Sequence, residues 1–515
     1  MITLTIALVV LSLFYYYYSV TSFKYWKTRG IKHDKPVPLF GNCLWYFLGK
    51  KSISDVATET YWKYCNEKAV GLFRGGRPEL VIRDPETIKH VLVTNFTNFH
   101  SRGLNHREDN SEPMMNNLFF AKGDVWRLLR QRMTPAFTTS KLKGMFPLIV
   151  ERAEKLQTRA LAAAATGQAI DVYSFMARYT IDFIASCGFG LDINALDQED
   201  SPVDKLGAKI FKYNTRDRLL RFINFLVPSI GKQFKVFRNI EDEMITLTKQ
   251  ILKQRNYEPS GRNDFIDLLL ECKKKGLIVG ESIENKKADG SPETATLELD
   301  DIILAAQILA FFAAGFETSS TATSFTLHLL AYNPEIQKKV QEDVDRVLNK
   351  YDNTLCYDAV KEMTYLDWTF KESLRIHPAT GVFVRECNQK TQIPNLNTTL
   401  DEGVRILIPV YALHHDPQYF DNPEEFRPER FSPEEFSNIT KYSYLPFGEG
   451  PRACIGERLA LMQSLAGLAA ILSRFTVEPA PESTRHPAYD PLTEITLMIK
   501  DELPLLLKKR SNTIL

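Results

Sequence analysis

Two stretches of the chain are apolar at nearly every position, and they predict two different kinds of helix. Residues 1–23 contain no charged side chain. As a helix they would span roughly 33 Å, about the hydrocarbon core of one bilayer. Residues 302–315 are apolar except for Gln307. This second run is too short to cross a bilayer, so it predicts a helix buried in the core of a large protein.

The buried helix is predicted to continue well past its apolar run. Asp300 or Asp301 can cap its first turn, and the dipeptide Asn333–Pro334 marks its end. These limits predict a helix about 45–50 Å long that passes through the middle of the protein.

Outside this helix, helical patterns dominate and strand-like runs are short. The clearest strand regions are 69–84 and 404–410, and no internal repeat is visible. Residues 273–300 are polar and rich in turn-forming residues, so they predict a flexible surface loop within a single body. The whole pattern predicts a mainly α protein with small β-sheets.

The segment 1–23 is predicted to be an uncleaved membrane anchor. A cleaved signal peptide is the alternative, but no basic segment precedes the apolar run and no small-residue cleavage site ends it. The flank that follows is mostly basic, which favours a cytosolic location for the rest of the chain. Residues 24–42, with two prolines and a glycine, predict a basic, stiff elbow. Residues 43–515 are then one catalytic domain.

Charge and cysteine content exclude several functions. The 64 lysines and arginines nearly cancel the 63 aspartates and glutamates, whereas a nucleic-acid-binding domain would be strongly basic. The seven cysteines form no C-x-x-C pair. The spacing therefore indicates neither a zinc site nor covalent haem attachment, and it suits reduced thiols in the cytosol.

One cysteine stands in an unusual setting. Cys454 follows a turn that contains Gly448, Gly450 and Pro451, and an apolar helical stretch comes next. A helix N-terminus favours a thiolate, and a thiolate in an apolar setting is an iron ligand for haem. Arg452 is suitably placed to meet a carboxylate of the same cofactor. A buried structural cysteine before a core helix is the alternative.

The complete motif is more specific than its parts. Phe447, Gly448, Gly450, Arg452, Cys454 and Gly456 form F-G-x-G-x-R-x-C-x-G, which resembles the haem-binding loop of cytochromes P-450. The resemblance extends over essentially the whole chain and is strongest to microsomal detoxification enzymes of insects. It implies the cytochrome P-450 fold, with a long central helix across haem b. It also implies that Cys454 ligates the iron and that Phe447 and Arg452 contact the haem.

Further motifs of this family occur in the expected order. Glu372 and Arg375 lie at i and i+3 in "KESLRIHP", and Arg430 lies in "RPERF". These residues resemble a buried ion network in which one acid compensates two arginines, and an exposed helical pair is the alternative. By resemblance, the network holds the haem-binding core and takes no part in the chemistry.

Three further positions resemble residues that contact haem propionates. Trp126 and Arg130 form W-x-x-x-R, with the two side chains on one helix face. Arg385, in "VFVREC", matches a basic position of similar sequences. Arg102, in "HSRGL", is a weaker match.

The segment "AAGFETSS" at 313–320 resembles the oxygen-activating motif above the haem. By this resemblance, Ala314 and Gly315 leave room for dioxygen. Glu317 and Thr318 are the predicted catalytic residues and supply protons. A threonine or glutamate in a helix usually faces solvent or bonds to its own turn, but here both lie in the most apolar helix of the chain.

The resemblance implies a haem-thiolate monooxygenase that inserts one oxygen atom from O2 into a lipophilic small molecule. No nucleotide-binding motif is present, so electrons are expected from an NADPH-dependent reductase in the endoplasmic reticulum membrane, with cytochrome b5 as a second candidate donor. The reductase is expected to dock on basic residues near the Trp126 helix, although these residues equally suit a merely solvated face: Arg127, Arg132, Lys141 and Lys143.

Two other functions remain open. A haem-thiolate isomerase or dehydratase would need no reductase, and such relatives usually lose the acid–threonine pair that this chain keeps. A non-catalytic haem or lipid carrier would need no proton relay. The substrate stays undetermined, because the predicted pocket is rich in aromatic residues that suit many lipophiles and equally suit core packing: Phe119, Phe120, Phe211, Phe222, Phe311, Phe312, Val382, Phe383 and Leu497.

Overall fold

The computed structural model describes most of the chain. The described residues are 5–6, 9–10, 12–13, 16–17, 21–105, 112–190, 207, 210, 235, 237–262 and 264–511. The predicted anchor 1–23 and the pocket residues Phe211 and Phe222 lie mostly or wholly outside them, so those predictions remain predictions.

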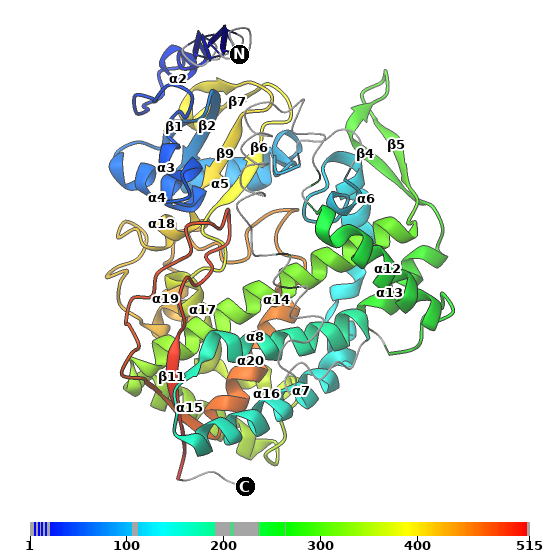
Figure 1. Ribbon diagram of the computed structural model, residues 1–515, viewed down its shortest axis with the longest axis vertical. Helices are drawn as coiled ribbons and strands as arrows, with labels where there is room; N and C mark the ends of the chain where they lie inside the picture. Colours follow the sequence, from blue (N-terminus) through cyan, green and yellow to red (C-terminus); the bar gives the residue numbers. More distant parts are fainter. Residues whose placement is uncertain are drawn as a thin grey trace.

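The protein has a β-rich region near its N-terminal end and a larger helical region (Figure 1). The main sheet has the strand order β1-β2-β9-β6, in which only β2 and β9 run parallel. A three-stranded sheet has the order β10-β11-β3, and two hairpins complete the β structure. The strands are β1 (Ala69–Arg74), β2 (Arg77–Ile82), β3 (Ile170–Asp171), β4 (Ile278–Lys286), β5 (Pro292–Leu297), β6 (Phe383–Glu386), β7 (Thr391–Ile393), β8 (Thr398–Leu400), β9 (Arg405–Ile408), β10 (Phe475–Pro479) and β11 (Pro504–Lys509).

Helices make up most of the remaining body, as the sequence pattern predicts. The α-helices are α2 (Tyr25–Thr28), α3 (Leu44–Phe47), α4 (Ile53–Lys63), α5 (Pro85–Lys89), α6 (Gly123–Met133), α7 (Thr139–Thr166), α8 (Val172–Ile184), α12 (Arg238–Gln254), α13 (Phe265–Lys274), α14 (Asp301–Ala331), α15 (Pro334–Lys350), α16 (Tyr357–Glu362), α17 (Thr364–Ile376), α18 (Val410–His414), α19 (Pro433–Phe436) and α20 (Glu457–Leu472). Short 3-10 turns join several of them, among them η3 (Pro113–Met115), η4 (Thr134–Phe137) and η7 (Pro428–Phe431).

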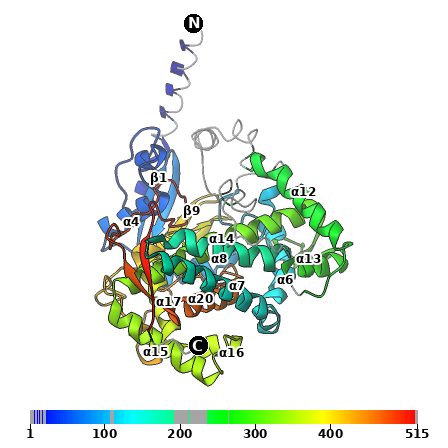
Figure 2. The ribbon, with the colours of Figure 1, turned by 60° about the horizontal axis from the view of Figure 1, so that its bottom comes forward.

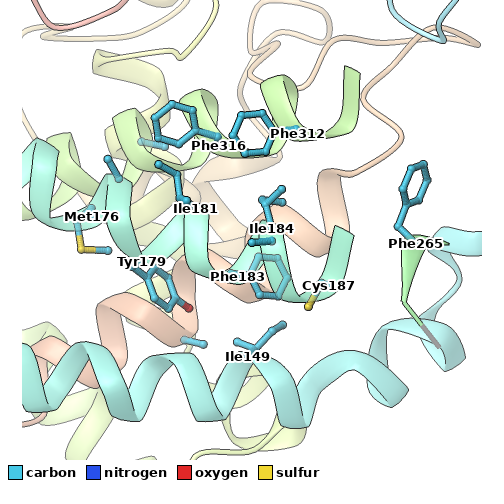
Figure 3. Packing of buried hydrophobic residues seen from close by; sticks show 14 of the residues in the cluster. Ile149, Met176, Tyr179, Ile181, Phe183, Ile184, Cys187, Phe265, Phe312 and Phe316 are labelled. Atoms are coloured by element: carbon cyan, nitrogen blue, oxygen red, sulfur yellow. The ribbon is translucent and has the colours of Figure 1, made fainter. Parts of the chain in front are cut away.

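The predicted central helix is confirmed as α14. The Asp300 carboxylate accepts a hydrogen bond from the Ile303 amide and caps its first turn. Both views show α8 beside α14 (Figure 1, Figure 2). In Figure 3, Ile181 and Ile184 of α8 point toward α14, Ile181 toward Phe316 and Ile184 toward Phe312. Among the helices that the structure describes, only α14 is long and apolar enough to cross a membrane, and 56% of its most apolar window is buried in the protein.

The prediction of a flexible loop at 273–300 is wrong. Residues Ile278–Lys286 and Pro292–Leu297 form the antiparallel hairpin β4–β5, which packs on α6. The Asp124 carboxylate of α6 accepts hydrogen bonds from the Ser282 hydroxyl and the Ile283 amide at 2.8 and 2.7 Å. The segment is rich in polar residues because only one face of the hairpin is covered by protein and the other face is in solvent.

The basic flank 24–42 packs against the main sheet. Trp26 of α2 is fully buried, and its indole nitrogen donates a hydrogen bond to the Leu72 carbonyl at 3.0 Å. Arg29 forms an ion pair with Asp401, beyond β8. These contacts attach the flank to the β-rich region.

Candidate active site

The loop before Cys454 folds tightly because it passes close to a neighbouring backbone. Gly448 and Gly450 both have positive φ, at 73° and 76°. A Cβ on Gly450 would lie 2.0 Å from the Leu92 carbonyl oxygen, so only glycine fits there. The Cys454 amide donates to the Phe447 carbonyl at 2.8 Å, which closes the loop.

The helix after the loop begins later than the sequence suggests. α20 starts at Glu457 with Gly456 as its N-cap, so Cys454 precedes the first turn by three residues. The thiol faces an interior cavity, and desolvation raises its pKa, although the nearby Gly456 amide lowers it in part. The Cys454 side chain is open to this cavity. For the chain alone the pKa shift is upward, opposite to the predicted direction, because desolvation outweighs the Gly456 amide and the nearby Arg130 and Arg102 guanidinium groups.

The cavity brings the predicted cysteine and threonine together. Cys454 and Gly456 line one side of it, and Ala314, Gly315 and Thr318 of α14 line another. Residues of α13, α20 and the turn η4 complete the lining, and most of them are apolar. The Cys454 thiol and the Thr318 hydroxyl of α14 thus face the same, mostly apolar cavity.

Ala314 and Gly315 play different parts in this wall. The Ala314 side chain is exposed to the cavity. A Cβ on Gly315 would lie 2.4 Å from Cδ1 of Ile184 on α8. Glycine is therefore needed at this position for the close approach of α8 as well as for free space in the cavity.

Four arginines lie near one another, and two of them, Arg102 and Arg130, interact electrostatically with Cys454. Arg130 comes from α6, Arg385 from β6, and Arg102 and Arg452 from loops. Arg102 Nη1 donates to the Phe119 carbonyl at 2.9 Å, and Arg385 Nη1 donates to the Val384 carbonyl at 2.9 Å. The Arg452 guanidinium lies 4.7 Å from the centroid of the Trp126 ring and donates to the Ala121 carbonyl.

Arg385 and Arg452 are buried and Arg102 and Arg130 are half-buried, beyond what their protein partners compensate. Desolvation lowers the pKa of Arg102 to about 10 and that of Arg385 to about 9, and it lowers the pKa of Arg452 strongly. Nε and Nη1 of Arg452 and Nε of Arg385 have no hydrogen-bond partner. Across the described part of the chain, none of the four pairs with a carboxylate.

Such a cluster needs an anion, because unpaired buried charge is costly. A cofactor that presents two carboxylates to the arginines and a metal to Cys454 satisfies both ends of the site. The residues therefore fit the predicted haem, and Arg102, Trp126, Arg130, Arg385 and Arg452 are the residues that would hold its propionates.

The predicted ion network is buried, as expected. Arg375 Nε lies 2.7 Å from Oε2 of Glu372, and Arg430 Nε lies 3.2 Å from Oε1. Arg375 also donates to the His414 carbonyl at 2.9 Å, and His414 Nε2 accepts from the Leu445 amide at 2.8 Å. Leu445 is two residues before Phe447, so the network reaches the loop that carries Cys454.

Glu317 and Thr318 point in different directions. The Thr318 hydroxyl lines the cavity and donates to the Ala314 carbonyl at 2.6 Å. Glu317 is only 2% exposed and is not among the cavity residues. Its carboxyl accepts hydrogen bonds from the Tyr173 hydroxyl of α8 and the Thr321 hydroxyl, and burial raises its pKa. The sequence gives no local signal for Tyr173, which lies 144 residues from its partner.

Three of the four basic residues proposed for docking already have acidic partners. Arg127 pairs with Glu281 of β4, Lys141 with Glu271 and Lys143 with Asp358. These pairs are solvent-exposed and therefore weak, so they leave a basic face that a partner's acids can share.

The aromatic residues of the predicted pocket are only partly assembled near the cavity. Phe311 lines it and packs between Phe137 and Phe265, with centroid distances of 5.5 and 3.9 Å. Phe312 is fully buried and stacks on Phe316. The other described members lie elsewhere than in this lining.

Comparisons with known proteins agree with this arrangement. The sequence profile of the family described as Cytochrome P450 matches residues 32–506. Similar proteins include Cytochrome P450 6B7 of Helicoverpa armigera, 36% identical over 92% of each chain. Cytochrome P450 6B1 of Papilio polyxenes is 34% identical over 95% of this chain and 96% of the relative. Probable cytochrome P450 6a13 of Drosophila melanogaster is 36% identical over 92% of each chain.

The match spans nearly the whole body, including the Cys454 loop, the Glu372 network and α14. A profile match of this extent, with relatives above 30% identity along the full length, is decisive for membership. The chain therefore belongs to the cytochrome P450 family and is a P450 monooxygenase.

Proposed function

We propose that the protein is a haem-thiolate monooxygenase of the endoplasmic reticulum that oxidises a lipophilic small molecule with electrons from an NADPH-dependent reductase. The observation that carries the proposal is the cavity that Cys454 and Thr318 both line, together with the buried Arg385 and Arg452 and the half-buried Arg102 and Arg130, none of which has an acidic partner among the described residues. The apolar anchor sequence supports the membrane location. The similarity to insect relatives supports a xenobiotic or an endogenous lipophile as the substrate.

Bound haem would supply the activation of dioxygen, and the Cys454 thiolate would hold its iron. The protein's part is to hold the cofactor and to control protons and water. Arg102, Arg385 and Arg452 would bind its carboxylates. Thr318 holds a proton on Oγ1 at the cavity wall, 2.6 Å from the Ala314 carbonyl. The apolar part of the lining, mainly from α14 and α20, suits a lipophile.

Electron supply is proposed to come from outside the chain, because the sequence has no nucleotide-binding motif. The exposed face of α6, which carries Arg127, suits an acidic partner surface. Cytochrome b5 is a second candidate partner on the same face.

Reconstitution with reductase tests the proposal. The full-length holoprotein is incubated with reductase, NADPH and a panel of lipophilic compounds that perturb its absorption spectrum. We expect at least one compound to raise NADPH consumption and to yield an oxygenated product. Substrate turnover without NADPH would favour the isomerase or dehydratase function. Compound binding with neither turnover nor NADPH use would favour the carrier.

Replacing Thr318 by alanine is expected to uncouple NADPH consumption from product formation. The variant keeps Cys454 and the arginines, so haem and substrate should still bind. It loses the hydroxyl at the cavity wall, and positioned proton donors typically contribute about 10²–10⁴-fold in rate. The measurement is NADPH consumed, hydrogen peroxide released and product formed in one assay, and we expect more peroxide and less product per NADPH.

Thr326→Ala is the matched control for this variant. The Thr326 hydroxyl of α14 likewise donates to the carbonyl four residues earlier, but it is fully buried and lies outside the cavity lining. It should leave coupling unchanged. Equal coupling in wild type and Thr318→Ala would remove Thr318 from the proton pathway.

A further inference from the structure

The carboxyl group of Glu317 is held by two hydroxyl groups. Tyr173 Oη of α8 donates to Oε2 at 2.8 Å, and Thr321 Oγ1 of α14 donates to Oε1 at 3.1 Å. Glu317 is 2% exposed. Both oxygens of a buried acid are therefore occupied by donors from outside the cavity.

This arrangement fixes the direction of the side chain. Successive residues of an α-helix point about 100° apart, so Thr318 faces the cavity while Glu317 faces α8. Thr321 is four residues after Glu317 and shares its helix face, so it cannot draw the acid away from that face. Tyr173 is the contact that comes from another helix.

We propose that Tyr173 is a positioning residue for the proton-donating acid of this enzyme: its hydroxyl holds the Glu317 carboxyl against α8, outside the cavity that Thr318 lines. The proposal rests on the proposed monooxygenase function. On this proposal, α8 controls where the Glu317 carboxyl lies and when that carboxyl gives up its proton. A proton held on Glu317 can reach the cavity only after the carboxyl leaves Tyr173.

The electrostatic surroundings of Glu317 are simple. Its pKa is raised by burial and lowered in part by the hydrogen bonds from Tyr173 and Thr321, and no charged side chain of the described residues contributes a shift. The phenol stays protonated because burial and the nearby carboxylate raise the pKa of Tyr173, with Asp171 adding a smaller effect. A donor stabilises the carboxylate, so removing it must raise the pKa of Glu317 further.

Infrared titration of the ferric holoenzyme tests this assignment without turnover. The band of the protonated Glu317 carboxyl is isolated by subtracting the spectrum of Glu317→Gln at each pH. In Tyr173→Phe we expect the midpoint of that band to move to higher pH by about one to two units, since the lost hydrogen bond is to a charged group. An unchanged or lower midpoint overturns the proposal.

Tyr179→Phe provides the matched control on the same helix. Tyr179 is fully buried in α8, but its hydroxyl donates to the Gln463 carbonyl at 2.9 Å, and its ring points away from Phe316 and α14 (Figure 3). It should leave the Glu317 midpoint in place. If Tyr179→Phe shifts the Glu317 midpoint as much as Tyr173→Phe does, then the loss of any tyrosine hydroxyl from α8 disturbs Glu317. That result would refute the specific role of Tyr173.

A fluorinated tyrosine placed at position 173 keeps the shape of the side chain if Tyr173→Phe does not fold. Fluorination makes the phenol a stronger donor, so the midpoint should move to lower pH, and no movement counts against the proposal. The reduced carbon monoxide spectrum of each protein is recorded in parallel. Loss of its thiolate band in the wild type would refute the proposed function, whereas the infrared midpoint would still decide the role of Tyr173.

Discussion

Glu372→Ala is expected to yield little or no haem-loaded protein. The change leaves the buried guanidinium groups of Arg375 and Arg430 without their shared carboxylate. Removing one partner of a buried ion pair costs about 3–5 kcal/mol, a large part of the roughly 5–15 kcal/mol that stabilises a folded protein. The damage should reach the Cys454 loop, because Arg375 bonds to His414 and His414 bonds to the Leu445 amide.

The measurement is the ratio of haem absorbance to protein after purification, together with the thermal unfolding midpoint. Glu59→Ala is the control: Glu59 pairs with Lys51 at 2.7 Å on the exposed face of α4, and its loss should change neither quantity appreciably. A stable, fully haem-loaded Glu372→Ala protein would show that the network is dispensable for the fold.

Cys454→Ser is expected to abolish the long-wavelength absorption band of the reduced carbon monoxide complex, and with it monooxygenase activity. That band reports a thiolate opposite the bound gas. A serine hydroxyl stays protonated near neutral pH and is a poor iron ligand, whereas a thiol is ionised by coordination. The side chains are nearly the same size, so the loop closed by the Phe447 carbonyl should persist.

Cys187→Ser is the control for the ligand assignment. Cys187 also lines the cavity and is 4% exposed, and burial raises the pKa of its thiol strongly. This variant should keep the band. Loss of the band in Cys187→Ser but not in Cys454→Ser would transfer the ligand role and refute the interpretation of the Cys454 loop.

The elements predicted most accurately are those whose determinants are local. The limits of α14 followed from an unbroken apolar run, a capping aspartate and a terminal Asn–Pro pair, and the structure confirms them. The spacing of Glu372 and Arg375 placed both on one helix face, which is a property of the helix period alone. The tight turn of the Cys454 loop was also predictable locally, because its glycines can adopt positive φ whatever surrounds them.

The errors arose where a distant segment changes the meaning of a local pattern. Residues 273–300 were predicted to be a loop because they are polar, but α6 supplies Asp124 as a partner that orders them into a hairpin. The thiol pKa of Cys454 was predicted to be low from its place before a helix. The direction in which its pKa shifts depends on desolvation in the cavity that α14 and α20 help to line. No local stretch of sequence around Cys454 contains both of these helices.

By itself, the sequence determined that this protein has a long buried helix, a cysteine in a glycine-rich loop and an acid–arginine pair on one helix face, since such features depend on residues within a few turns of one another. The sequence resemblance predicted that four arginines from four separate segments meet one cofactor, but only the tertiary structure decided that they gather without a carboxylate partner among the described residues. It also decided that Glu317 turns toward Tyr173 and away from the cavity. The physical reason is that burial and charge compensation depend on which segments meet in space, and residues 144 positions apart become partners only when α8 packs against α14.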